Sequence, residues 1–158
     1  MIDLRFPTAL QMLLSLALSE EEGFPRMSSS QLAKGVNVNP AFVRKLLVPL
    51  VRDGLITSTM GKNGGVQLAR PAQDISYREI FTSVTEGKKL WTARGDVPHR
   101  CLVSTYAVDL FEALADDAEM VVLELLATRN LRAGLEELRG RDKAAGSTRS
   151  APEHSAAL

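Results

Sequence analysis

The stretch from Ser28 to Arg70 constrains the fold more than any other part of the sequence. Ser28 and Gln31 have the spacing of a capping box, which predicts that a short helix begins at this point. Asn39 is a favoured N-cap and Pro40 a favoured first helical residue, so a second helix is expected directly after the first. Two short helices in this order are typical of a helix-turn-helix.

A β-hairpin with a glycine-rich tip is predicted after the second helix. Residues 55–60 are rich in isoleucine and threonine, and residues 66–69 alternate between apolar and polar side chains, as half-buried strands do. Three glycines, Lys62 and Asn63 separate the two segments. A loop with so few side chains can approach a phosphate backbone closely, with Lys62 and peptide N–H groups as contacts. A hairpin in this place is the wing of a winged helix-turn-helix.

The second helix is expected to have an apolar and a polar side. The apolar side recurs at helical spacing and consists of Val43, Leu46, Leu47 and Leu50. The opposite side carries Ala41, Arg44, Lys45, Val48 and Arg52. Pro49 lies inside this helix, where a proline loses a hydrogen bond and clashes with the preceding turn. We therefore expect a kink or a break there, which would turn Arg52 away from the polar side.

Charge is unevenly distributed along the chain, although the net charge is zero. Residues 31–70 carry six basic residues and one acidic residue, a net charge of +5, whereas residues 101–139 carry three basic and eight acidic residues, a net charge of −5. This division favours one surface for nucleic acid and another turned away from it. The alternative is that both segments are ordinary solvated helix faces.

Further helices are predicted on both sides of the winged helix-turn-helix. The expected segments are a helix at residues 8–19 with Thr8 as N-cap, a helix at 75–86, a loop at 87–99, a long helix at 102–127, a short helix at 128–138 and a disordered tail at 140–158. The long helix carries an apolar stripe wider than a small domain can cover, which indicates a dimer interface. The interface positions are Val103, Ala107, Leu110, Leu114, Val121 and Leu125. The alternative is a helix packed only on its own domain.

These elements define the fold class as mainly α with a small β-hairpin wing, a winged helix-turn-helix plus a long C-terminal dimerisation helix. No enzyme is expected, because the sequence has two histidines, no Ser-His-Asp arrangement and no P-loop spacing around Lys62. No cofactor or metal is expected from the single cysteine, which also suggests a reducing compartment. We expect a cytoplasmic protein without a signal peptide or a membrane-spanning segment.

Several motifs resemble those of the Rrf-two family of bacterial winged helix-turn-helix regulators, which includes the iron–sulfur regulator IscR. They are Arg5-Phe-Pro-Thr-Ala-Leu, Gln31-Leu-Ala, Asn39-Pro-Ala-Phe-Val-Arg-Lys-Leu-Leu, Asp53-Gly-Leu-Ile, Gly64-Gly-Val-Gln-Leu-Ala-Arg-Pro and Ile75-Ser-Tyr-Arg-Glu-Ile. The resemblance covers residues 1–139 and implies a dimeric transcription factor that binds double-stranded DNA. It implies a DNA-binding domain at 1–87, a linker loop and dimerisation helices at 88–139, and a tail at 140–158.

The expected DNA contacts come from the first helix, the second helix and the wing. They are Ser28, Ser30, Asn39, Ala41, Phe42, Arg44, Lys45, Lys62, Asn63 and Gly64. Met60 stands where wings of the family often carry an arginine that reaches the minor groove. The leading hypothesis is a homodimeric repressor, and the alternative is a winged-helix module that binds protein instead of DNA. The basic residues on the second helix and wing favour DNA.

Cys101 is the candidate sensor. Several family members hold an iron–sulfur cluster through three cysteines in this region, whereas this chain has Cys101 alone and is more similar to the cluster-free branch. Neighbouring His99 and Arg100, together with a helix N-terminus, are expected to lower the pKa of its thiol and make it reactive. The alternative is a small buried hydrophobic residue. A metal site built from His99 and Cys101 of two subunits is the alternative to a chain without a metal.

Overall fold

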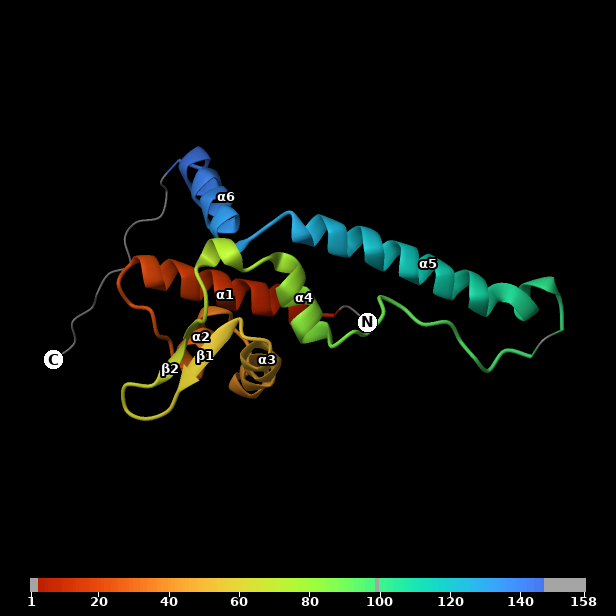
Figure 1. Ribbon diagram of the computed structural model, residues 1–158, viewed down its shortest axis with the longest axis horizontal. Coiled ribbons are helices and arrows are strands. Elements are labelled where there is room, and N and C mark those ends of the chain that lie inside the picture. The colour runs from red at the N-terminus through yellow and green to blue at the C-terminus, as the bar shows by residue number, and fades with distance from the viewer. Residues whose placement is uncertain (1–2, 99, 147–158) are drawn as a thin grey trace.

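The computed structural model describes residues 3–98 and 100–146. A compact body holds most of the elements, and one long helix projects from it (Figure 1). The elements in order are α1 (Arg5–Glu21), α2 (Ser29–Gly35), α3 (Pro40–Arg52), β1 (Ile56–Thr59), β2 (Gly65–Leu68), a short 3-10 turn η1 (Ala72–Asp74), α4 (Tyr77–Thr85), α5 (Leu102–Ala127) and α6 (Leu131–Ala144).

Helix α1 forms the centre of the body and packs against α2, α4, α6 and β2. Its buried face includes Met12, Leu13 and Leu16. The prediction that this helix begins at Thr8 is wrong, since it begins at Arg5 and Thr8 is buried inside it. Pro7 lies in the first helical turn, where a proline is tolerated because the N–H groups there have no helical partner.

Local capping fixes the helix-turn-helix as the sequence indicated. The Ser28 hydroxyl accepts from Gln31 N at 3.1 Å while the Gln31 side chain accepts from Ser28 N at 2.7 Å, which completes the capping box of α2. Asn39 Oδ1 accepts from Ala41 N at 2.8 Å and starts α3. The expected break at Pro49 is wrong. The helix continues to Arg52, because Pro49 is buried in the core side and its carbonyl still accepts a bond from Asp53 N.

The predicted hairpin is confirmed as an antiparallel pair whose register places Ile56 opposite Leu68 and Thr59 opposite Gly65. Its inner side buries Ile56, Val66 and Leu68, while the side chains of β1 that follow Ile56 are exposed. Met27, just before α2, exchanges two backbone hydrogen bonds with Val66, at 3.0 and 2.8 Å. The wing is therefore tied to the start of the helix-turn-helix as well as to its own partner strand.

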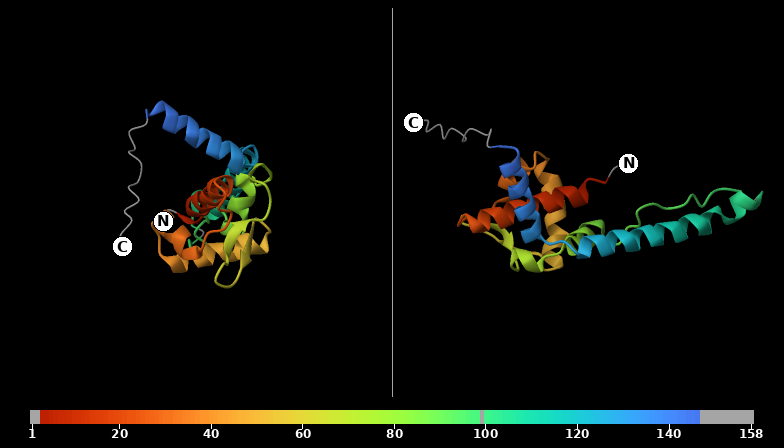
Figure 2. Two further views of the ribbon diagram at one scale, coloured as in Figure 1. Left: turned by 90° about the vertical axis from the view of Figure 1, so that its left-hand side faces the viewer. Right: turned by 90° about the horizontal axis from the view of Figure 1, so that it is seen from above.

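Helix α5 has the bounds predicted from its periodicity and lies mostly outside the body (Figures 1 and 2). All residues of α5 are described, and only Ala115 among them is buried. The predicted loop returns alongside it: Lys89 pairs with Asp116 at 2.8 Å, and Trp91 Nε1 donates to the Phe111 carbonyl at 3.2 Å. His99 lies outside the described residues.

Helix α6 continues to Ala144, so residues 140–144 are helical and the tail does not begin at Gly140 as expected. The i, i+4 ion pair of Glu137 with Arg141 and the basic residues of the last turn favour this extension. The rest of the expected tail, residues 147–158, lies outside the described part of the chain. Within that described part, none of the helices combines the length and apolar character that crossing a membrane requires.

Candidate nucleic-acid interface

The turn between α2 and α3 orients the two helices so that one side of α3 is left open. Asn37 adopts a left-handed conformation with φ of 51°, which suits the short side chain of asparagine. Helices α2 and α3 then pack together and bury Leu32, Val43 and Leu46. The other side of α3 faces away from the core.

The open side of α3 carries most of the residues expected there. Ala41, Arg44 and Lys45 are exposed. Phe42 is only half-buried but packs against the core, so it supports the helix more than it offers a contact. Asn39 is exposed, yet its side-chain oxygen is engaged in the cap, which leaves its amide NH₂ as the group available to a ligand.

The tip of the wing is shaped by its glycines. Gly61 has a φ of +106°, a conformation that residues with a side chain rarely adopt. A Cβ on Gly64 would overlap the Thr59 carbonyl oxygen, so this half-buried glycine is needed for the tight turn. Lys62 and Asn63 are exposed at the tip, and Met60 just before it is 95% exposed.

The two serines expected to contact DNA lie at the start of α2. Ser30 is exposed there, whereas Ser28 is half-buried and caps the helix.

Ion pairing separates the basic residues of this segment into two groups. Arg52 pairs with Asp53 at 2.8 Å and with Glu86 at 3.6 Å, and Arg70 pairs with Glu79 at 2.9 Å. The other basic residues form no ion pair with any residue that the structure describes; they are Lys34, Arg44, Lys45 and Lys62. Arg52 is thus engaged by acidic side chains, although the break at Pro49 that was expected to redirect it is absent. Lys34 was not among the DNA contacts expected from the sequence. Its exposed position in the last turn of α2 makes it a further candidate.

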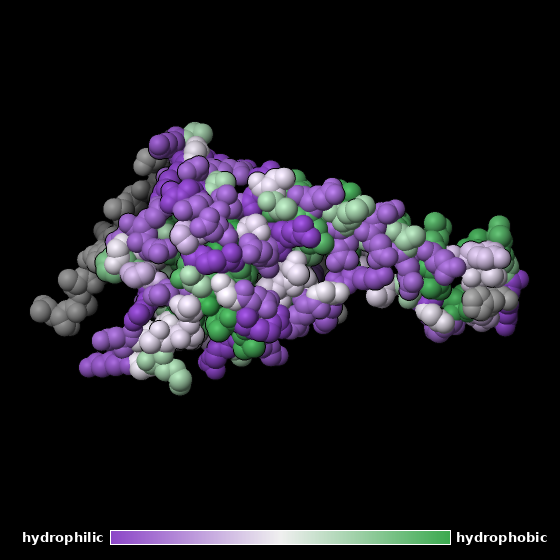
Figure 3. Space-filling view, in the orientation of Figure 1, coloured by the Kyte–Doolittle hydropathy of each residue, from purple (hydrophilic) through white to green (hydrophobic). Residues whose placement is uncertain are grey.

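The exposed apolar residues of α5 form a second surface on the part of the molecule that projects from the body, where Figure 3 shows several hydrophobic groups among hydrophilic ones. Val103 is 71% exposed, Leu110 65% and Val121 62%. Leu114 and Leu125 are exposed as well, and Ala107 is half-buried. The alternative in which α5 packs along its length on its own domain is therefore wrong.

Cys101 is exposed and forms the N-cap of α5, so its interpretation as a buried packing residue is wrong for the protomer. Its Sγ lies 3.5 Å from the Ser104 hydroxyl. That hydroxyl and the backbone N–H groups of Ser104 and Val103 lower the pKa of the thiol below its usual value. The helix N-terminus thus acts as the sequence suggested, together with the Ser104 hydroxyl, whereas Arg100, one of the expected cations, is not among the causes.

Comparison with known families settles the class of the protein. A family model described as Rrf2, iron-dependent transcriptional regulator, matches residues 2–136. The chain belongs to the Rrf2 (Rrf-two) family. This membership confirms the resemblance found in the sequence and places the chain in a family described as transcriptional regulators.

Individual relatives and structures agree with the Rrf2 assignment. The HTH-type transcriptional regulator IscR of Cereibacter sphaeroides is 35% identical over 78 residues, 49% of this chain and 50% of that protein. The chain thus spans about half the length of such curated relatives. T. potens IscR matches with a TM-score of 0.63 at 17% identity, covering 96% of this chain and 93% of that one. CymR (YrzC), the global cysteine regulator of B. subtilis, matches with a TM-score of 0.61 at 19% identity, and the match covers 87% of this chain and 97% of that one. These structures confirm the winged-helix fold.

The iron dependence in the family description raises the question of a cluster, and the donor residues of this chain do not fit one. Iron–sulfur clusters are held mainly by several cysteine thiolates, whereas Cys101 is the single cysteine of the sequence. Among the described residues, no group of three or more His, Cys, Asp and Glu side chains is placed to hold a metal ion. His99, the other donor considered at the sequence level, lies outside those residues.

Proposed function

We propose that this Rrf2 protein is a homodimeric, sequence-specific DNA-binding repressor of the cytoplasm. The observation that supports this most is the exposed, unpaired set of cations on α3 and the wing tip. Cations without protein partners are available to neutralise phosphates and to release counterions. In a helix-turn-helix, the second helix enters the major groove and the wing follows the backbone beside it.

The contacts divide by the kind of recognition that each can perform. Arg44 lies at the centre of the open side of α3 and suits bidentate recognition of a guanine edge. Lys62 at the wing tip suits a phosphate, which positions the protein without reading sequence. Further contacts are proposed for exposed residues of α2, α3 and the wing, namely Ser30, Asn39, Ala41, Lys45 and Asn63. The backbone of Gly64 is proposed to lie beside the phosphates.

Dimerisation through α5 would complete the recognition surface. A two-fold pair of α5 helices covers both stripes and presents two α3 helices to one face of the duplex. Helix-turn-helix dimers read half-sites about 34 Å apart, roughly one helical turn of DNA. We therefore expect the operator to be an inverted repeat with that spacing.

The test begins with selection of bound DNA from a random pool, followed by fluorescence anisotropy on the selected site over a range of salt. Arg44→Ala should cost about 1–3 kcal/mol and relax preference at one base pair in each half-site. Lys62→Ala should weaken binding to all sequences alike and reduce the salt slope by about one. Arg141→Ala, on α6, serves as a charge-matched control.

Two outcomes would reject this proposal. Selection could yield no enriched sequence, or the Arg44→Ala/Lys62→Ala double variant could bind like the wild type at every salt concentration. Either result would favour a module that binds protein, for which the exposed Val48 and Met60 on the same side of the molecule would be the first residues to examine.

A further inference from the structure

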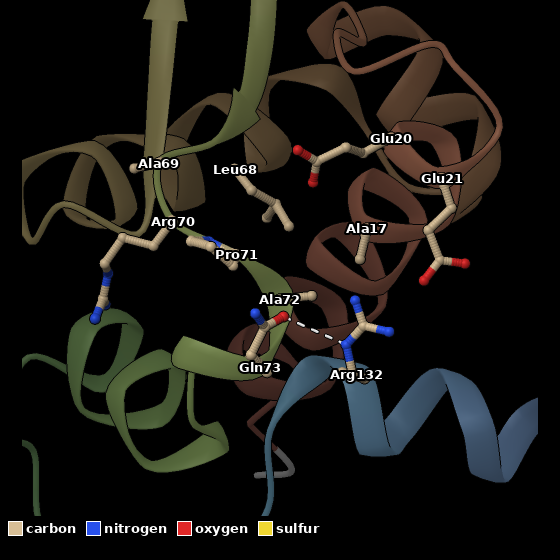
Figure 4. Close-up of a pocket in the computed structure, with 10 residues that line it drawn as sticks. All are labelled: Ala17, Glu20, Glu21, Leu68, Ala69, Arg70, Pro71, Ala72, Gln73 and Arg132. Atoms are coloured by element: carbon tan, nitrogen blue, oxygen red, sulfur yellow. Dashed lines mark hydrogen bonds between the residues drawn. The ribbon is translucent and has the colours of Figure 1, made fainter.

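A cavity of about 420 Å³ lies where three segments distant in the sequence meet (Figure 4). The end of α1, the connection from β2 to η1, and the first turn of α6 form its walls. Ala17, Leu68 and Ala72 provide a floor of small and aliphatic side chains. The volume falls within the range of small-molecule sites, which are commonly about 300–1,000 Å³.

Two opposite charges face this floor from different walls. Figure 4 shows the Glu20 carboxylate reaching over the cavity from α1 and the Arg132 guanidinium reaching toward it from α6. The Glu20 carboxylate takes part in no hydrogen bond or ion pair with the residues that the structure describes. Arg132 uses only Nε, which donates to Gln73 Oε1 at 3.3 Å, so its two terminal nitrogens have no partner among those residues.

The other charged groups of the lining are already neutralised. Glu21 pairs with Arg139 of α6, and this pairing lowers the pKa of the Glu21 carboxyl, with a smaller contribution from the positive charge of Arg132. Arg70 is directed away from the cavity and pairs with Glu79 (Figure 4). Two exposed side chains therefore remain beside the apolar floor: Glu20, which has no ion pair among the described residues, and Arg132, whose terminal nitrogens make no hydrogen bond with them.

We propose that this cavity binds a small zwitterion of the α-amino-acid class. The ligand ammonium group pairs with Glu20, the ligand carboxylate accepts from the terminal nitrogens of Arg132, and a small apolar side chain rests on Leu68 and Ala72. Charge-assisted hydrogen bonds of this kind are stronger than neutral ones, and a guanidinium matches a carboxylate with two parallel bonds.

The position of the cavity gives such a ligand a route to regulation. Residues 69–72 continue directly from the wing strand β2, and α6 follows α5 along the chain. A ligand held by Glu20 of α1 and Arg132 of α6, with its side chain on Leu68 and Ala72, links the base of the wing to α1 and to the helix that follows α5. If the ligand binds the DNA-bound and free forms with different affinity, it must change DNA affinity by the same factor. This regulatory step rests on the proposed function, whereas ligand binding itself does not.

The direct test is thermal denaturation and titration calorimetry of the full chain, without DNA, against a panel of standard L-α-amino acids. At least one of them should raise the melting temperature in a saturable manner. Glu20→Gln and Arg132→Gln should each weaken its binding by at least about tenfold, because each removes one charge-assisted contact. Glu22→Gln and Arg78→Gln are the matched controls, since both change exposed charges outside the cavity.

Analogues that lack one charge separate this site from a simple ion site. The corresponding carboxylic acid without its amine should bind the wild type more weakly than the amino acid, and Glu20→Gln should remove that difference. Equal binding of the two compounds to the wild type would overturn the proposal in favour of an anion site. So would a panel in which no amino acid binds, or binding that both cavity variants retain. Failure of DNA binding in a protein that still binds an amino acid would count against the regulatory function alone.

Discussion

At the N-terminus of α5, the Cys101 thiol combines exposure with hydrogen bonds that stabilise its thiolate form. The thiolate is the nucleophilic form of cysteine, so a lowered pKa increases its reactivity near neutral pH. Attack of the thiolate on a peroxide oxygen breaks the O–O bond, forms a sulfenic acid and releases water after protonation of the leaving hydroxide. This is the simplest chemistry by which the regulator could respond to oxidants.

Iodoacetamide titration against pH tests the state of this thiol. Cys101 should react at lower pH than it does in the denatured chain, whose thiol has a pKa of about 8.5. Ser104→Ala should shift the profile upward, because the Ser104 hydroxyl is the largest cause of the lowered pKa. Loss of DNA binding after mild peroxide in the wild type, but not in Cys101→Ser, would support a sensor. Identical profiles for the native and denatured protein would exclude it.

Asp53 provides a pH-dependent contribution to stability. Its pKa is lowered from 3.8 to about 2, chiefly by hydrogen bonds from Arg52. Because the pKa is lower in the folded protein than in the unfolded chain, the stabilisation is present above about pH 4 and is lost as the pH falls toward 2. Asp53→Asn should destabilise the protein at neutral pH by at most about 1 kcal/mol, since the pair is on the surface. Urea denaturation at several pH values should show this difference vanish in acid; a constant difference would contradict it.

Among the elements, α6 packs against α1 and η1, and its Gly134 also meets Tyr77 at the start of α4. A Cβ on Gly134 of α6 would overlap the Tyr77 hydroxyl and lie 3.1 Å from Leu14 Cδ2. Burial of Tyr77 raises the pKa of its hydroxyl, as expected for a group enclosed between helices. The contact explains why α6 tolerates a residue that is unfavourable in a helix interior.

Gly134→Ala should therefore destabilise the protein by about 1–3 kcal/mol through overpacking, although alanine is the better helix former. Gly140→Ala in the same helix has open space around the new methyl group and should be neutral or stabilising by up to about 1 kcal/mol. Melting temperatures of the two variants provide the comparison. Tyr77→Phe should relieve part of the Gly134→Ala defect, and a loss that is the same for both alanine variants would show that the contact does not matter.

Elements governed by local rules were predictable from the sequence. The caps at Ser28 and Asn39, the hairpin and both ends of α5 follow from side chains near to one another in the chain. The start of α1, the continuity of α3 through Pro49 and the cavity beside Arg132 depend on packing between distant segments, which periodicity does not report. Helical spacing placed Ala41, Arg44 and Lys45 on the exposed side of α3, whereas Phe42 packs against the core. The ion pairing of Arg70 was not foreseeable.

At the scale of the whole molecule, the body and α5 have different relations to solvent. The body buries a continuous core around α1, whereas α5 leaves an apolar stripe open along its length. Apolar area of this kind, about 25 cal/mol for each Å² covered, is the main source of stability in protein association. The dimer should accordingly depend on α5, while the body folds around its own core.

Leu114→Glu should convert the protein into monomers, because pairing of two α5 helices would bury an unpaired carboxylate. Sedimentation equilibrium at micromolar concentration measures this directly, with Glu112→Gln, an exposed residue on the opposite side of α5, as the control. The variant should keep the fold of the body and lose specific DNA binding. A monomeric wild type, or a dimer that survives Leu114→Glu, would show that the stripe serves another contact.

The projection of α5 also has a consequence for how such a regulator would respond to its own abundance. When the chain concentration is below the dissociation constant of the dimer, the concentration of dimers rises with the square of the chain concentration. Operator occupancy would then change more steeply than expression of the gene, even without an effector. A regulator that represses its own promoter would thereby hold its copy number within a narrow range. The length of the α5 stripe would set that range, because it determines the dissociation constant of the dimer.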